Sequence, residues 1–442
     1  MSAERSDIHA APLPSSGRRF AIGLLSLLHY AVLGCVLPLL PNLLRERFGL
    51  TWTELAAVLT ALPLGLLPVG AIANGTARIG IDPKTSAATT YLLMAGLLMA
   101  GTSYLQRTPL QSLHVLELSG GLLAFFVLLC LALRWLPEIA GRLTGASNTA
   151  WRLWGAIGFI LPAWLLESSM LPRFGVTVPA LTLETTFEAA AWLSAVAVPI
   201  ALLTPAASTT DEESASPTIQ TRMSTRLVVG IAIAAVVSRM HVVTTAPFTA
   251  AVIDHYAITE RLLARIVVVS GVFEVVALFG IGLALKVLGP RGTLLLAGIG
   301  WLMRCGLLAW TAQTPITSRE ALLSLVAAQA LCGLSTASVF AALAASTNGF
   351  RTLTVSSTIS RTSGLAGAAG ILVMGVLADA LLESTGPAAG LLQWLPKSFN
   401  IATHAVGLTG WAGVWWCSAV APALLILIAV VLPMSVTREH SQ

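Results

Sequence analysis

Twelve long apolar segments set the main constraint on how this 442-residue chain can fold. Each has close to the roughly 20 mostly apolar residues that an α-helix needs to cross a bilayer. Because backbone polar groups cannot stay unpaired in lipid, such segments are expected to be helical. We therefore predict an all-α integral membrane protein with twelve transmembrane helices. The segments lie near 20–41, 53–75, 86–105, 110–133, 146–168, 187–204, 227–250, 262–286, 293–312, 320–346, 353–382 and 408–433.

The composition excludes the main classes of soluble protein. Charged residues make up 10% of the chain and hydrophobic residues 56%, whereas a soluble domain is about 25% charged. Too few polar side chains remain to cover a water-exposed surface, which excludes cytosolic enzymes and nucleic-acid-binding proteins. The net charge of +5 is better interpreted as an orientation signal than as a surface for nucleic acid.

Basic residues in the loops predict which side of the membrane holds the termini. With the N-terminus placed in the cytoplasm, inside loops and tails carry 13 of the 25 Lys and Arg residues, and outside loops carry 8. Cytoplasmic loops carry the basic excess in membrane proteins. We therefore expect a multi-pass protein of the bacterial inner membrane with both termini in the cytoplasm.

Short repeated motifs indicate that the chain consists of two related halves. The pattern Arg-x-x-Gly-x-x-Gly begins at Arg152 and returns at Arg361, and Leu-Leu-Glu-Ser occurs at 165–168 and 381–384. A polar stretch separates the sixth and seventh segments and predicts a cytoplasmic linker at 206–226. We expect one six-helix half at 1–205 and another at 227–442. Parallel six-helix repeats with a midplane site are the construction of the major facilitator fold.

Charged residues inside the apolar segments mark a candidate transport pathway, because a charge at the bilayer centre is costly. Glu274 has no polar residue within three positions on its C-terminal side, so it cannot easily reach the interface. We expect it to take part in proton coupling, together with Arg304 one helix later. A purely structural ion pair between the two is the alternative. The full set of charged or titratable candidates is Glu117, Arg152, Arg239, His241, Glu274, Arg304, Arg361 and Asp379.

Arg152 lies between Trp151 and Trp154. These residues could clamp a planar solute by stacking and donate hydrogen bonds to it; an interfacial aromatic belt is the alternative interpretation. Glu117, from the fourth helix, could partner Arg152. His241 could contact the solute or relay a proton, although a buried histidine without such a role is equally compatible with the pattern.

Sequence motifs of soluble catalysis are absent. The chain has no P-loop, HExxH or GxSxG, so neither an ATP-driven pump nor an enzyme is expected. Five cysteines lie in apolar runs without a CxxC pair: Cys35, Cys130, Cys305, Cys332 and Cys417. We expect no disulfide, metal site or cofactor.

Several motifs together resemble the nucleoside–proton symporter family of the major facilitator superfamily. The stretch 152–159, Arg-Leu-Trp-Gly-Ala-Ile-Gly-Phe, resembles a signature of that family's fifth helix, and 301–309 followed by Thr314-Pro315 is similar to one in its ninth. Phe273-Glu274 matches the family's eighth-helix Glu, and 409–415 resembles the start of its last helix.

The resemblance implies proton-driven uptake of a nucleoside by alternating access, in a monomer. It implies that Arg152 and Phe159 face the central cavity and that Glu274 serves substrate binding or coupling. With the residues singled out above, we expect Arg152, Trp154, Phe159, Glu117 and His241 to bind the substrate.

The chain also departs from the family. The tenth-helix Tyr and Asp are missing from 332–338, and seventh-helix amides are missing around 243–246. Gly271 stands where a polar residue is expected, and 73–78 lacks the acidic residue common in the second-to-third-helix loop. Two alternatives therefore stay open. One is a carrier on the same fold for a sugar, another metabolite or a drug, and the other is a membrane sensor without transport.

Overall fold

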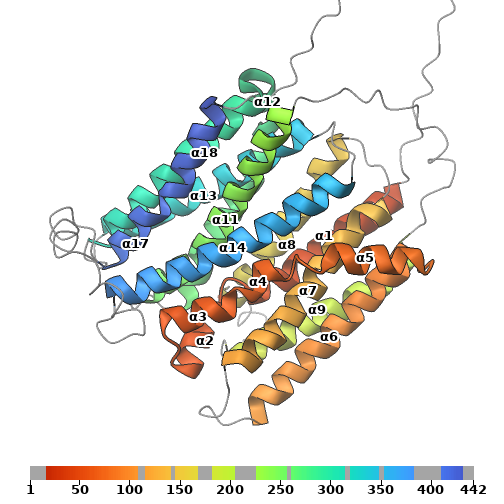
Figure 1. The fold of residues 1–442 in the computed structure, drawn as a ribbon. Helices are drawn as coiled ribbons and strands as arrows, with labels where there is room; N and C mark the ends of the chain where they lie inside the picture. The colour runs from red at the N-terminus through yellow and green to blue at the C-terminus, as the bar shows by residue number, and fades with distance from the viewer. Residues whose placement is uncertain are drawn as a thin grey trace, which may run out of the picture.

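A computed structural model describes residues 16–107, 115–140, 145–167, 182–204, 225–255, 260–313, 319–347, 353–382 and 410–431. The ordered elements within these ranges are all helices (Figure 1). Ten of the helical segments are long and apolar enough to cross a membrane. The prediction of an all-α integral membrane protein is confirmed, while most of the expected linker lies outside the described residues.

The first half of the chain contains helices α1 to α9. Prolines break two of its crossings into shorter helices, because proline lacks the N–H that an α-helix interior needs. Pro38 lies between α1 and α2, and Pro68 precedes α5. The bounds are α1 Ser16–Val36, α2 Leu40–Phe48, α3 Trp52–Leu59, α4 Ala61–Leu64, α5 Val69–Arg78, α6 Pro83–Arg107, α7 Val115–Ala140, α8 Gly145–Glu167 and α9 Leu183–Leu203.

The second half contains helices α11 to α18, of which α12 is two crossings joined by a sharp turn. Gly289 forms that turn with φ of 66°, a backbone conformation that favours glycine, and Pro290 follows it. The ten candidate crossings count α12 once, and the apolar stretch of α8 within the described residues, Arg152–Pro162, is shorter than a crossing. The bounds are α11 Thr225–His255, α12 Glu260–Thr311, α13 Arg319–Thr347, α14 Leu353–Leu382, α17 Gly410–Ser418 and α18 Val420–Val431.

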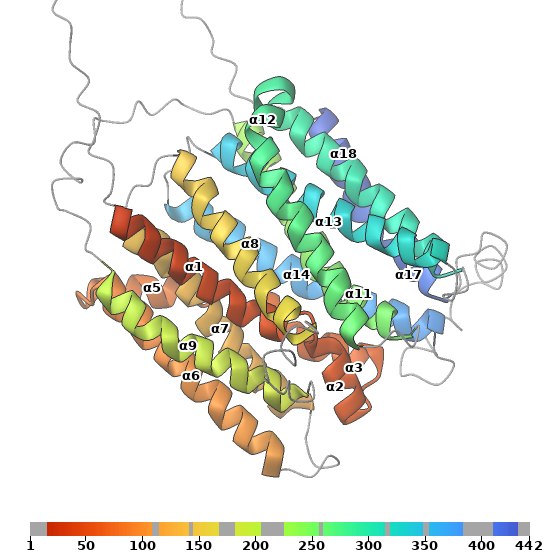
Figure 2. The same cartoon turned by 180° about the vertical axis from the view of Figure 1, so that it is seen from behind.

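The helices form two groups that meet along one boundary. Figures 1 and 2 show α1 to α9 on one side and α11 to α18 on the other. Across the boundary α14 packs against α3 and α4, α12 packs against α8, and α11 packs against α2. We call the end of the bundle where α9 ends and α11 begins the linker end, and the opposite end the far end.

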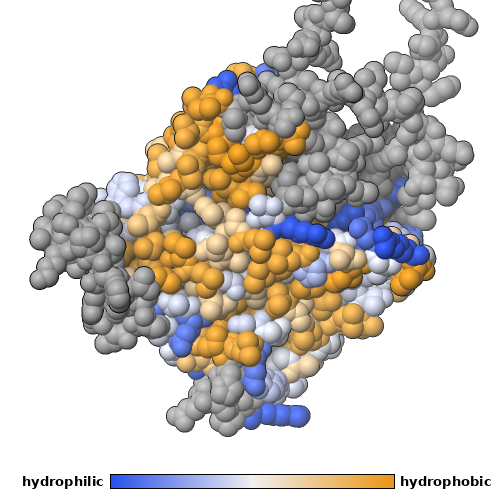
Figure 3. All heavy atoms as spheres, viewed as in Figure 1, coloured by the Kyte–Doolittle hydropathy of each residue, from blue (hydrophilic) through white to orange (hydrophobic). Residues whose placement is uncertain are grey.

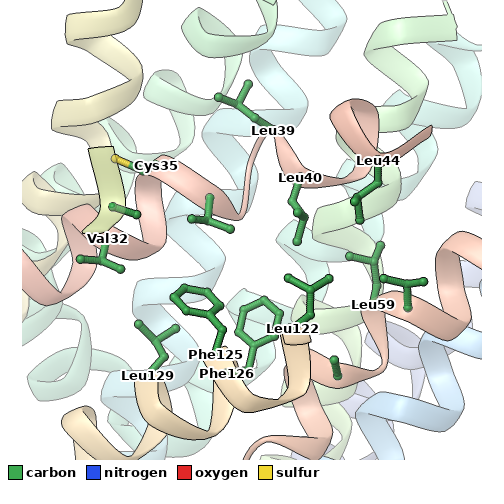
Figure 4. Close-up of a cluster of buried hydrophobic side chains, with 14 of the residues drawn as sticks. Val32, Cys35, Leu39, Leu40, Leu44, Leu59, Leu122, Phe125, Phe126 and Leu129 are labelled. Atoms are coloured by element: carbon green, nitrogen blue, oxygen red, sulfur yellow. The ribbon is translucent and has the colours of Figure 1, made fainter. Parts of the chain in front are cut away.

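Apolar side chains lie both inside the bundle and on its outer surface. Figure 4 shows a buried cluster in the first half, in which Phe125 and Phe126 of α7 pack beneath residues of α1, α2 and α3. Large apolar side chains such as Phe279 and Leu283 are exposed, and Figure 3 shows apolar atoms over much of one face. This pattern is typical of a protein whose outer surface contacts lipid.

Glycines allow α1 and α8 to approach at backbone distance. A Cβ atom at Gly158 would overlap the carbonyl of Leu27, and one at Gly34 would overlap the carbonyl of Phe159. Small residues permit this close packing between membrane helices. The glycines of the Arg-x-x-Gly-x-x-Gly pattern therefore fix the position of α8, the helix that carries Arg152, against α1.

Candidate functional site

Four polar side chains from four helices lie at the boundary between the halves, three of them near the midpoints of their crossings and the fourth, Arg152, roughly 10 Å from the linker end of α8. Tyr30 is on α1, Arg152 on α8, Arg239 on α11 and Glu274 on the first crossing of α12. None of the four is fully buried, and Arg239 is exposed. We call these four residues the central cluster.

Tyr30 lies among the charged members of the central cluster. Its side chain interacts electrostatically with Arg152, Arg239 and Glu274. A Cβ atom at Gly155 would lie 2.7 Å from the Tyr30 ring, so this glycine lets the ring lie directly against α8. Tyr30 is not among the site residues predicted from the sequence, although a phenol within an apolar helix is itself a signal.

Arg152 contacts the second half of the protein through an aromatic ring. Its guanidinium carbon lies 4.2 Å from the ring centre of Phe340 on α13, and 40% of the Phe340 side chain is exposed. A cation–π contact of this kind contributes about 0.5–2 kcal/mol. Arg152 makes no hydrogen bond or ion pair with any other described residue. Its five N–H donors are therefore available to a ligand.

Glu274 is half-buried and held firmly in place by its neighbours. A Cβ atom at Gly333 of α13 would overlap the Ser270 carbonyl and lie 2.7 Å from the Glu274 backbone nitrogen. On the other side, Gly271 packs against the Ile160 side chain of α8. Arg152 interacts electrostatically with the Glu274 carboxylate, but no ion pair within 4.0 Å joins Glu274 to another described residue.

Two further residues of α8 face α1. Trp154 covers Gly23 and meets Phe20 edge to face, with 5.9 Å between ring centroids. Phe159 is half-buried, and its carbonyl packs against Gly34. The structure therefore places Trp154 against α1 rather than against the ring of Phe340, and the side chain of Trp151 lies outside the described part.

The expected partnership of Glu117 and Arg152 is wrong. Glu117 is in the first turn of α7, roughly 35 Å along that helix from the linker end. Arg152 is only roughly 10 Å from the linker end of α8. Glu117 is exposed, accepts a hydrogen bond from the Tyr104 hydroxyl at 3.1 Å, and lies at an apolar pocket between α6, α7 and α9.

The alternative of an ion pair between Arg304 and Glu274 is also wrong. Arg304 is 2% exposed and points into the second half, where it donates to the hydroxyls of Thr245 and Thr249 at 3.0 and 2.7 Å. The reason is geometric, since Arg304 lies on the second crossing of α12 and faces α11 instead of the first crossing. His241 is buried beside it, with its ring centroid 4.8 Å from that of Trp301. These residues form a separate cluster inside the second half.

Asp379 joins the two halves at the far end. It is fully buried on α14, and its two carboxylate oxygens accept the backbone N–H groups of Trp52 and Thr53 at 2.8 and 3.0 Å. The Trp52 ring also meets that of Trp411 on α17 edge to face, at 5.0 Å. A carboxylate of the second half thus caps a helix of the first half.

Comparison with known proteins identifies the fold. No protein-family model and no curated protein matches the sequence. The structure is similar to the nucleoside transporter NupG, with a TM-score of 0.66 and 16% identity over 93% of this chain and 98% of that one. It is also similar to the xylose transporter XylE from E. coli, with a TM-score of 0.65 and 12% identity over 93% of this chain and 97% of that one. A bacterial homologue of the human lysosomal transporter Spinster has a TM-score of 0.63 and 13% identity over 93% of this chain and 94% of that one. The predicted major facilitator fold is confirmed.

Proposed function

We propose that the protein takes up a small polar, nucleoside-like solute together with protons by alternating access. The observation that carries this proposal is the central cluster, which contains unpaired donors and a carboxylate at mid-membrane and at the boundary of the halves. Polar groups at that depth mark solute and ion pathways, and major facilitator carriers bind their solutes at the interface of their repeats.

Each member of the site has a distinct role in this proposal. Arg152 donates hydrogen bonds to the solute, while the rings of Phe340 and Tyr30 offer flat surfaces to its planar part. Glu274 takes up and releases the proton. Protonation removes the attraction between Glu274 and Arg152 and leaves the guanidinium to the solute, which links the two binding events.

Alternating access requires the halves to separate at the far end. The Asp379 cap on α3 then breaks and forms again once in each cycle. We place both termini in the cytoplasm, so the far end faces outward, and we take the monomer as the working unit.

The test is uptake of labelled uridine and adenosine into proteoliposomes, with and without an inward proton gradient. We expect accumulation above equilibrium that a protonophore abolishes. Glu274→Gln is expected to lose this accumulation because the amide cannot carry the proton. Glu320→Gln removes an exposed carboxylate in the first turn of α13 and is expected to keep it. Accumulation that persists in Glu274→Gln contradicts the coupling role, and absence of uptake by folded protein contradicts the nucleoside assignment.

A further inference from the structure

We propose that the transported solute is an organic anion, bound between Arg152 and Arg239 with its planar part against Phe340. This inference rests on the proposed function and specifies the substrate class of the same site. The central cluster contains two guanidinium groups and one carboxylate. Its charge balance, rather than any single contact, carries the argument.

Arg239 belongs to the same space as Arg152, although it comes from the other half. It lies near the midpoint of α11, and its side chain is exposed. It interacts electrostatically with Tyr30 on α1 and with Cys130 on α7, both in the first half. Val243 lies one turn further along the same face of α11. A Cβ atom at Gly367 of α14 would lie 3.6 Å from the Val243 side chain and 3.0 Å from Pro63 of α4 in the first half. The face of α11 that carries Arg239 therefore lies at the boundary, where Arg239 can meet a ligand that Arg152 also holds.

The described residues offer no second carboxylate to balance these two cations. Arginine stays charged in proteins, and Glu274 can neutralise only one of the two. Asp379 is engaged with the backbone of α3, and Glu117 lies at the far end. An uncompensated cation in the membrane interior is costly, and a carboxylate or phosphate of the solute supplies the missing charge in a geometry that suits guanidinium groups.

The proposal has a consequence for the charge that crosses the membrane. A neutral nucleoside carried with one proton moves one positive charge per cycle. A monoanion carried with one proton moves none. The anion compensates the second guanidinium while Glu274 is ionised, and once Glu274 is protonated the anion takes its place as the counter-ion of the site. Uptake of the monoanion is therefore expected to respond to an imposed pH difference and not to an imposed membrane potential.

Matched probes test the sign of the solute charge. Uridine is neutral. Uridine-5′-carboxylate carries one carboxylate on its sugar, and orotidine carries one carboxylate on its base. Binding to the purified protein in nanodiscs is measured by thermal shift and by titration calorimetry. We expect at least one anion to bind about 10- to 100-fold more tightly than uridine, the range of a charge-assisted contact. Uridine binding at least as tightly as both anions overturns the inference, and so does a failure of both anions to bind.

Variants then assign the preference to Arg239. Arg239→Gln is expected to weaken anion binding about 10-fold or more, which brings the affinity for the anions close to that for uridine, while Arg239→Lys keeps part of the preference. Arg107→Gln, which removes an exposed cation at the end of α6, is the matched control. A preference that survives Arg239→Gln overturns the role of this residue.

The outcomes also separate this inference from the proposed function. Proton-driven accumulation of uridine that neither anion inhibits leaves the proposed function intact and overturns the anion inference. Selective anion binding that depends on Arg239, without proton-driven accumulation in proteoliposomes, supports the anion inference and contradicts symport.

Discussion

Removal of the Asp379 carboxylate is expected to shift the protein away from the far-end-closed conformation that the structure shows. The first four N–H groups of a helix have no partner inside it. In α3 the Thr51–Glu54 capping box satisfies two of these groups. The other two, on Trp52 and Thr53, are satisfied by Asp379 from the opposite half. Asp379→Ala leaves both without a partner, but only while the halves are together.

The magnitude follows from the number and type of bonds lost. A hydrogen bond to a charged group contributes about 1.5–3 kcal/mol, so the two bonds together stabilise the closed far end by about 3 kcal/mol or more. When the far end opens, water can reach the same N–H groups, and the carboxylate no longer matters to them. At about 1.4 kcal/mol per factor of ten, Asp379→Ala lowers the closed-to-open ratio about 100-fold. Asp379→Asn, which keeps one acceptor oxygen, is expected to have roughly half the effect in free energy.

Distances between spin labels measure this shift in a background without native cysteines. One label pair, at Arg107 and Arg319, reports on the far end, and a second, at Arg78 and Lys286, reports on the linker end. All four side chains are exposed and close to helix ends. In Asp379→Ala we expect the far-end distance to lengthen and the linker-end distance to shorten.

A control variant separates this effect from simple damage to the helix. Glu54→Gln weakens a cap that lies entirely within the first half, so it destabilises both conformations equally and is expected to leave the distances unchanged. If Asp379→Ala also leaves both distance distributions unchanged, then the cap does not favour the closed far end and the reasoning is refuted.

Two further predictions concern packing and pairing within the second half. Gly333→Ala is expected to lower the melting temperature because its Cβ overlaps the backbone of α12, a strain of about 1–3 kcal/mol; Gly306→Ala, whose Cβ has open space, is expected not to lower it. Double-mutant cycles on the free energy of unfolding test the pairing of Arg304. The coupling between Arg304→Met and Thr249→Val is expected to be about 1 kcal/mol. The coupling between Arg304→Met and Glu274→Gln is expected to be less than about 0.5 kcal/mol. A larger coupling to Glu274 would contradict the separation of the two clusters, and a melting temperature unchanged by Gly333→Ala would contradict the close packing.

The sequence was sufficient to predict the fold, because bilayer thickness imposes one length on every crossing. Apolar length alone located the helices, and repeated glycines pointed to related halves. The sequence could not show that a single sharp turn at Gly289 joins the two crossings of α12. It also could not show that prolines divide the first two crossings. Those details depend on local backbone geometry rather than on hydropathy.

The site was predicted less well, because sequence gives the depth of a residue but not its rotation. Arg152 and Glu274 were selected and lie in the central cluster, whereas Arg304 was selected for the same site and faces α11 instead. Glu117 was misplaced in depth, since the fourth helix begins with it near the far end. Asp379 was selected only as one of the charged residues within the apolar segments, and its role as a cap on α3 depends on contact between segments more than 300 positions apart.

A comparison of two helix-capping aspartates shows why the far end controls the equilibrium between the two arrangements of the halves. Asp82 accepts the backbone N–H of Lys84 at 3.1 Å at the start of α6, within its own half, so its bond is the same in every arrangement of the halves. Asp379 makes the same kind of bond across the boundary, so its bond favours one arrangement. A ligand changes a conformational equilibrium only by its difference in affinity for the two states. Under the proposed function, a solute that binds the central cluster more tightly when the far end is open has to offset the cap by an amount comparable to about 3 kcal/mol. The cap sets the free energy that binding at mid-membrane has to overcome, and weakening the cap is expected to tighten binding of any solute that prefers the open far end.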